Sequence, residues 1–141
     1  MKKIFFTVLL LICILATGFA KSKMPIAVTS AFNQKFPNAT NVKWDKENAQ
    51  EYEAEFVWNS VNFSANFSDN GEWIKTESPS SFNQLPEKVK AEFNKLHKGS
   101  KVKSVSKIDT SKRKTIFEIE IMKGVRIIEL FYLEDGTETK E

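Results

Sequence analysis

The chain is poor in the side chains that most often do chemistry in enzymes. Its 141 residues include one histidine, His97, and one cysteine, Cys13. His97 lies among lysines at the end of a predicted helix, where an imidazole can simply interact with the helix C-terminus. The serines lack the Gly-x-Ser-x-Gly or Ser-x-x-Lys context of a nucleophile, and a zinc site here would need mostly carboxylate ligands, which is an uncommon set. We therefore predict no catalytic residue, no metal site and no cofactor.

Paired carboxylates are the remaining candidates for acid–base chemistry. Glu53 and Glu55 are two residues apart in one alternating segment, and Glu118 and Glu120 have the same spacing in another. Each pair must share one face of a strand, because successive side chains point to opposite faces. We interpret both pairs as solubilising charges on an outer strand face rather than as a general acid and base.

The first 20 residues have the three-part layout of a secretory signal peptide. A basic start (residues 1–3) precedes an apolar run (residues 4–16), and small residues at positions 18 and 20 suit the cleavage site. The alternative is a membrane anchor, but the apolar run is shorter than the roughly 20 residues that span a bilayer. Cleavage after Ala20 would remove Cys13 and two lysines, leaving 19 basic and 18 acidic residues. A periplasmic or secreted domain without disulfides depends on its hydrophobic core for stability.

The rest of the chain carries one pattern twice, over residues 25–77 and again over residues 86–138. Each copy predicts a short amphipathic helix, then alternating strands and a tight acidic-Gly turn, at residues 69–71 and 134–136. Neither turn continues into the twelve-residue pattern of a calcium loop, and glycine suits the positive φ of a tight turn. The Ser-Pro-Ser-Ser link between the copies is too short to separate independent domains. We therefore expect an α+β fold of two tandem helix-plus-antiparallel-sheet units packed as one domain.

Apolar residues define the inner face of each predicted unit. In the two helices they recur at helical spacing at Val28, Ala31, Phe32, Phe36, Val89, Phe93 and Leu96. A two-residue hairpin at Asn59-Ser60 would place apolar residues opposite one another, and the segments around Phe117 and Tyr132 can pair in the same way. Each helix is too short to be stable alone, so each must pack on its sheet.

The outer face of the second unit is unusually apolar. A face that meets water should be polar, but this one carries Met122, Val125, Ile127, Phe131 and Leu133. One interpretation is a central strand where the two sheets join, with its second face covered by a loop or a terminus. The other is an exposed apolar patch for a partner.

The charge is distributed unevenly along the sequence. Residues 86–115 carry ten basic and three acidic side chains, a net charge of +7, whereas residues 39–77 have a net charge of −5. The basic region, residues 88–114, is either a solvated surface or a surface for an anionic lipid or ligand. Nucleic acid is not expected as a partner, since no base-stacking motif interleaves these lysines.

Several short motifs resemble a known family. Phe-Pro-Asn-Ala at 36–39 leads to Val-Lys-Trp at 42–44, followed by Tyr-Glu-Ala-Glu-Phe at 52–56 and Phe-Ser-Asp-Asn-Gly-Glu-Trp at 67–73. In these motifs the chain resembles the PepSY-like exported proteins, a family described as β-lactamase-inhibitor-like. The second copy looks like a more diverged version, without the Lys-Trp pair. The resemblance implies a helix packed on an antiparallel sheet, used twice, in a small envelope protein of Gram-negative bacteria. It also implies binding of other proteins, as proposed for PepSY domains, but it carries no contact residues across.

We therefore predict a non-enzymatic exported module that recognises another protein through the sheet face away from the helices. Aromatic and apolar side chains on a rigid sheet give a large contact area at low entropy cost. The candidate partner-binding residues are Trp44, Trp73, Met122, Ile127 and Phe131. The alternative is a binder of anionic lipid or a small ligand through residues 88–114.

Overall fold

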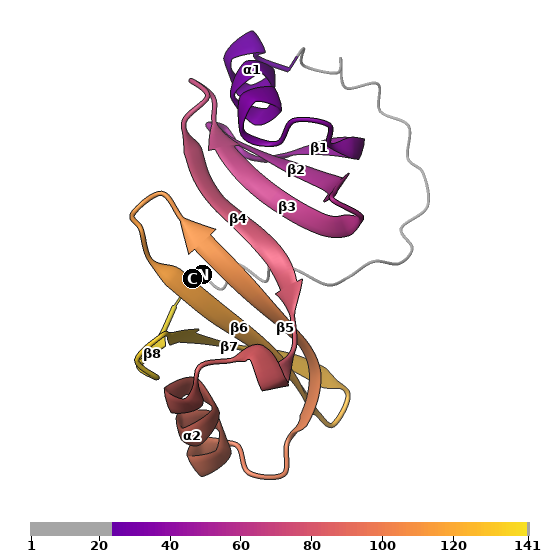
Figure 1. The fold of residues 1–141 in the computed structure, drawn as a ribbon. Helices are drawn as coiled ribbons and strands as arrows, with labels where there is room; N and C mark the ends of the chain where they lie inside the picture. The colour runs from indigo at the N-terminus through magenta and orange to yellow at the C-terminus, as the bar shows by residue number, and fades with distance from the viewer. Residues whose placement is uncertain (1–23, 141) are drawn as a thin grey trace.

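The computed structural model describes residues 24–140 (Figure 1). The predicted signal peptide, residues 1–20, lies outside the described residues. Strands make up most of the fold, with two short helices. In chain order the elements are α1 (Ile26–Lys35), β1 (Thr40–Asn48), β2 (Glu51–Trp58), β3 (Val61–Ser68), β4 (Trp73–Ser80), the 3₁₀ helix η1 (Phe82–Gln84), α2 (Glu87–Leu96), β5 (Lys101–Thr110), β6 (Thr115–Lys123), β7 (Arg126–Leu133) and β8 (Glu138–Thr139).

All eight strands form one antiparallel sheet, and each strand pairs with its neighbours in the sequence. The pairing of β4 with β5 joins the two halves and runs from Lys75 opposite Thr110 to Ser80 opposite Val105. The expectation of an α+β fold built from two tandem helix-plus-sheet units is therefore wrong. The chain forms one continuous, mainly β structure, and the predicted internal repeat is not borne out.

The error arose at Pro79, which suggested a link but lies within β4. Ser111 N–H donates to Ile74 C=O at 2.8 Å. Ile74 and every second residue after it along β4 therefore point their backbone N–H and C=O groups toward β5. Pro79 is one of the alternate residues of β4 whose backbone groups point toward β3, so its nitrogen faces β3. The last β3–β4 pair is Ser64 with Glu77, so the ladder has ended before Pro79 and no N–H is needed there.

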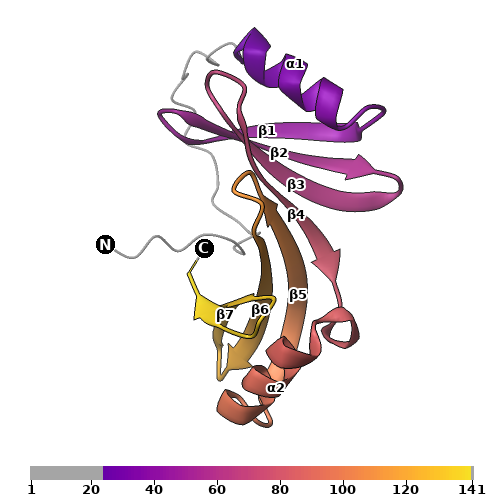
Figure 2. The same cartoon turned by 60° about the vertical axis from the view of Figure 1, so that its left-hand side comes forward.

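Both helices pack on the same side of the sheet, although they lie over different halves of it (Figures 1 and 2). Residues paired across strands share a face, and Ala65 of the first core pairs with Thr76 on β4. Ser80 lies four residues further along β4, on the same face as Thr76, and pairs with Val105. Val105 in turn pairs with Ile119, which belongs to the core under α2. We call this side the helix side and the opposite one the helix-free side. Residues on the helix-free side include Glu53, Asn66, Glu77, Glu118 and Glu129.

An aromatic cluster holds α1 on the sheet. Phe32 is 3% exposed, and its ring centroid lies 4.9 Å from Phe56 and 5.2 Å from Trp44. Phe36 lies 4.6 Å from Phe56. The β2–β3 hairpin has the predicted register, with Phe56 opposite Phe63, because Asn59 and Ser60 adopt the positive φ values of a two-residue turn.

The second helix is held by a smaller set of contacts. Val89 and Phe93 are buried in a core that includes Ile119 and Tyr132. Leu96 was also expected in this stripe, but it is 49% exposed. It is the last residue of α2, and only Val89 and Phe93 of this helix are buried.

Gly71 sets how closely the β3–β4 turn approaches α1, which gives a test of the packing. Its φ is +87°, and a Cβ there would lie 2.6 Å from the Ala27 carbonyl oxygen. Gly124, in the β6–β7 turn, also has positive φ but has no atom within 4 Å of such a Cβ. We expect Gly124→Ala to lower the free energy of unfolding by about 1 kcal/mol and Gly71→Ala by about 2–4 kcal/mol, since backbone overlap adds to the left-handed strain. Urea denaturation of both variants checks this, and equal losses would contradict the close approach.

Candidate functional site

The helix-free side carries a groove that crosses from one half of the sheet to the other. It has a volume of about 670 Å³ and lies between the β1–β3 region and β5–β7. Its floor includes Ile108 and Ile116, which are 1% and 8% exposed although they lie on the helix-free side. Carboxylates at its walls are Glu47, Glu51, Glu53, Glu77 and Glu118, and lysines at its rim are Lys75, Lys112, Lys114 and Lys140. A second hollow of about 870 Å³ shares Glu77 with it.

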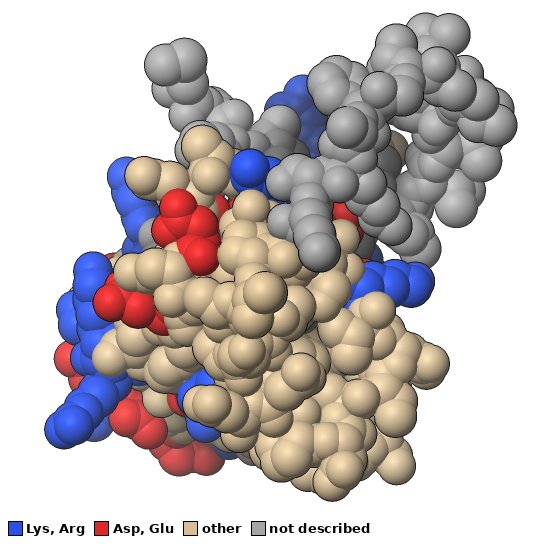
Figure 3. Space-filling model, turned by 90° about the horizontal axis from the view of Figure 1, so that it is seen from above, with Lys and Arg blue, Asp and Glu red and all other residues tan. Residues whose placement is uncertain are grey.

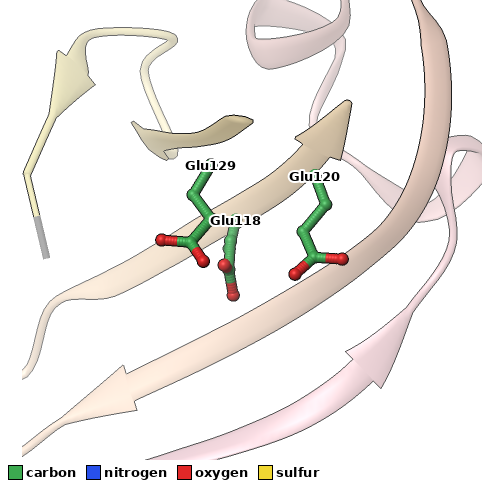
Figure 4. A group of neighbouring side chains, drawn as sticks. All are labelled: Glu118, Glu120 and Glu129. Atoms are coloured by element: carbon green, nitrogen blue, oxygen red, sulfur yellow. The ribbon is translucent and has the colours of Figure 1, made fainter. Parts of the chain in front are cut away.

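Three carboxylates gather beside this groove on β6 and β7. Glu118, Glu120 and Glu129 point toward one another (Figure 4), and each contributes an oxygen that lies within 4.8 Å of those of the other two. The sheet register explains the cluster, since Glu120 is directly opposite Glu129 and two residues from Glu118 on one face of β6. Lys103 Nζ lies 3.1 Å from Glu120 Oε2, and Ser104 Oγ donates to the same oxygen.

Burial and mutual repulsion raise the pKa values of two of these carboxyls. Burial, with the charges of Glu77, Glu129 and Glu120, raises the pKa of Glu118 to about 8. Burial also raises the pKa of Glu129, and the charges of Glu120 and Glu77 add to it. At neutral pH the cluster therefore carries less negative charge than three exposed carboxylates would.

Glu53 is a second, partly buried carboxyl of the groove, on the half of the sheet formed by β1–β3. Burial raises the pKa of Glu53 to about 7, helped by a hydrogen bond and a charge from Glu47. Asn66 lies directly opposite Glu53 and donates from Nδ2 to Glu51 Oε1 at 2.9 Å. Asn66 is 3% exposed, and its Oδ1 accepts no hydrogen bond within residues 24–140.

The chemistry that these groups offer is recognition of positive charge. Glu118, Glu120 and Glu129 have the donor type and spacing of a hard-cation site. Lys103 already places an ammonium against Glu120, and a pKa of about 8 leaves Glu118 mostly protonated at neutral pH. Burial raises the pKa of Glu129 in the same direction. A cationic side chain of a partner would compete with those protons for the same oxygens.

Two of the five predicted partner-binding residues lie on the helix side. Trp44 is opposite Ala54, and its ring centroid lies 6.3 Å from Phe67. Trp73 is opposite Phe67, donates from Nε1 to Thr76 Oγ1 at 2.8 Å, and lies under Lys35 Nζ at 3.7 Å. Both rings are part of the packing around α1. For these two residues the placement on the outer face was wrong.

The other three predicted residues lie on the helix-free side. Met122 is directly opposite Ile127, and Phe131 is opposite Glu118. Ile127 is 37% exposed, and Met122 and Phe131 are partly buried. The apolar surplus is not at the junction of the two halves, which is formed by β4 and β5. The role of the five residues in binding remains a prediction.

The carboxylates are the part of the site that sequence reasoning missed. The spacing of Glu118 and Glu120 placed them correctly on the outer face, but it suggested solvated charges. Both are 7% exposed. The available signal was the run of large apolar residues on both sides of them, which indicates a strand that is buried on two faces.

Part of the basic region is paired with acidic side chains. Four of its ten basic residues are in ion pairs, Lys90 with Glu87, Lys95 with Glu92, Lys103 with Glu120 and Lys107 with Asp109. Lys112, Arg113 and Lys114 are exposed at the β5–β6 turn. On the face seen in Figure 3, lysines and arginines lie beside acidic residues.

The buried carboxyl of Glu118 predicts a loss of stability at high pH. Its folded-state pKa of about 8 lies above the ordinary 4.5, so the stabilisation is complete below pH 4.5 and is lost as the pH rises through about 8. Glu118→Gln should remove much of this dependence and exceed the wild type in unfolding free energy at about pH 9 by about 1–2 kcal/mol, a figure reduced for solvent screening. Urea denaturation as a function of pH measures it, with Glu55→Gln at an exposed position of the same side as the control. A wild type that gains stability between about pH 6 and pH 9 would contradict the burial of this group.

Solved structures with the same fold come from Bacteroides species. A "putative periplasmic proteins" structure from Bacteroides eggerthii has 19% identity and a TM-score of 0.74 and covers 82% of this chain and 86% of its own. A DUF2874 family protein from Bacteroides ovatus has 25% identity, a TM-score of 0.72 and coverages of 82% and 84%. A BLIP-like protein from Bacteroides fragilis has 25% identity, a TM-score of 0.68 and coverages of 81% and 82%.

Other comparisons place the chain in a family without naming a function. No curated protein matches it. Within residues 24–140, no helix combines the length and apolar character needed to cross a membrane. The family described as "Putative beta-lactamase-inhibitor-like, PepSY-like" matches residues 16–64 and 50–137, and the chain belongs to this family.

Proposed function

We propose that this protein is an exported, non-enzymatic binding module that recognises another protein through the helix-free side of its sheet. The observation that carries the proposal is the groove, which is lined by residues from both halves of one continuous sheet. A rigid sheet presents such a surface with little loss of conformational entropy on binding. The β-lactamase-inhibitor-like description of the family supports a protein partner.

The composition of the groove supports a protein partner more than a small ligand. Its floor of Ile108 and Ile116 is apolar, its walls are acidic and its rim carries lysines. An apolar centre with a charged rim is the usual anatomy of a protein–protein interface. Exposed Ile127 and partly buried Phe131 extend the apolar surface on the same side.

Export is supported by two observations. The layout of residues 1–20 fits a secretory signal peptide, and one protein of the same fold is described as periplasmic. We propose the envelope of a Gram-negative cell as the place of action. The alternative, binding of an anionic lipid through residues 88–114, is weakened because four of the ten basic side chains are already engaged in ion pairs.

The proposed face predicts where a partner will crosslink. A photo-reactive residue at Asn62 or Ser106, both at the second hollow of the helix-free side, should crosslink one defined protein in intact cells of the native host. The same residue at Asn33 of α1 or Asn94 of α2, both exposed on helices, should not. Mass spectrometry of the adducts identifies the partner.

Matched variants separate loss of binding from loss of folding. Ile127→Asn, at an exposed position, should change the unfolding free energy by less than about 1 kcal/mol and weaken the crosslink. Trp44→Ala should lower stability by about 2 kcal/mol or more, because it empties part of the α1 core. Crosslinks to that protein from the helix positions alone would refute the proposed face.

A further inference from the structure

Within residues 24–140, the outer edge of β7 is unpaired along most of its length. Strand β8 pairs with β7 only at Phe131 and Tyr132. Among the strands formed by residues 24–140, none pairs with that edge between Arg126 and Leu130. An edge of this kind offers unpaired N–H and C=O groups to another strand.

The hydrogen bonds of the β7–β8 turn show which groups face outward. Leu133 N–H donates to Thr137 C=O at 2.9 Å, so Leu133 points its backbone groups toward β8. These groups alternate along a regular antiparallel strand, and the β6–β7 register has no shift from Lys123 opposite Arg126 onward. Ile127 and Glu129 therefore point their N–H and C=O groups away from β6.

The other edge of the sheet is protected, whereas this one is not. Strand β1 has register shifts between Thr40 and Lys43 and between Lys46 and Asn48, and Asn41 has a φ of +55°. Irregularities of this kind hinder the pairing of a further strand. Strand β7 is regular and apolar, and Val125 in the adjoining turn is 97% exposed.

The side chains on this edge specify the charge of an incoming strand. A residue placed opposite Glu129 would share its face and lie beside Glu118 and Glu120. The charges around Glu129 are acidic apart from Lys103, and burial and those acids raise its pKa. A basic residue opposite Glu129 would offset this repulsion, and an acidic one would add to it.

We propose that the outer edge of β7 accepts an extended segment of a partner protein, with a lysine or arginine opposite Glu129 and an apolar residue opposite Ile127. The backbone groups of Ile127 and Glu129 supply the affinity, and the acidic cluster selects the charge. The inference does not depend on the proposed function, because it concerns the sheet edge and its backbone rather than the groove.

A synthetic peptide tests the edge directly. The heptapeptide acetyl-Thr-Val-Thr-Lys-Thr-Val-Thr-amide has an apolar residue two positions from lysine in either strand direction. At millimolar concentration it should slow amide hydrogen exchange at Ile127 and Glu129 in NMR spectra of the protein. Ile128 and Leu130, whose N–H groups face β6, should change little. A peptide with glutamate in place of lysine should bind about tenfold more weakly, because its carboxylate would face the acidic cluster. That ratio corresponds to about 1.4 kcal/mol.

Two variants make the result decisive. Ile127→Pro removes one outward N–H while leaving the β6 ladder intact, as proline is tolerated on an edge strand, and it should abolish the protection at Glu129. Glu129→Gln leaves the backbone unchanged and should remove the preference for lysine over glutamate. The proposal is overturned if the lysine peptide gives no protection at Ile127 and Glu129 or if both peptides bind equally. It is also overturned if protection without peptide rises with protein concentration, because a second copy of the chain would then occupy the edge.

Discussion

The β4–β5 ladder holds the two halves of the chain in one sheet. Six residue pairs, from Lys75–Thr110 to Ser80–Val105, connect the half covered by α1 to the half covered by α2. Because paired residues share a face, this register places both helices on the same side. A register slip by one residue at β4–β5 would put α2 on the opposite face, and the helix-free side would no longer be continuous.

The helix-free side has two kinds of buried group, and the curvature of one sheet brings them together. Ile108 and Ile116 form an apolar floor, and Glu53, Glu77 and Glu118 lie around it. Desolvation of Glu53 and Glu118 works against folding at high pH. Buried carboxylates of this kind are common at recognition sites. A cation of a partner can supply the opposite charge that the folded chain itself does not provide.

Local features of the structure could be predicted from the sequence. The register of β2 with β3 and of β6 with β7 followed from alternation and turn chemistry. Helical spacing also predicted the buried residues of both helices, Val28 and Phe32 in α1 and Val89 and Phe93 in α2. These predictions depend on segments that are close in the sequence. A shift of one residue in their pairing would bury polar side chains, so the correct register is strongly favoured.

The features that failed depend on distant contacts. Pro79 marked a link because proline is rare in central strands, and only the end of the β3 ladder explains why it is tolerated there. Trp73 was assigned to the wrong face because the irregular β3–β4 pairing between Asn66 and Phe67 shifts the alternation by one residue. Trp44 was misplaced because its role in the α1 core needs the three-dimensional position of Phe32. The burial of Glu118 and Glu120 likewise depends on the neighbouring strands β5 and β7, whose positions the spacing does not reveal.

The continuity of the sheet decides whether the two halves share one helix-free side, and NMR across β4 and β5 measures it. Glu77 and Ile108 form a pair whose backbone groups point away from each other, and their α-protons should lie close enough for a strong nuclear Overhauser effect. Lys75 with Thr110 and Pro79 with Ser106 should give the same signal. Observation of all three supports one sheet with a common helix-free side. Their absence, with the hairpin signals within each half retained, would show two separate sheets and contradict the account.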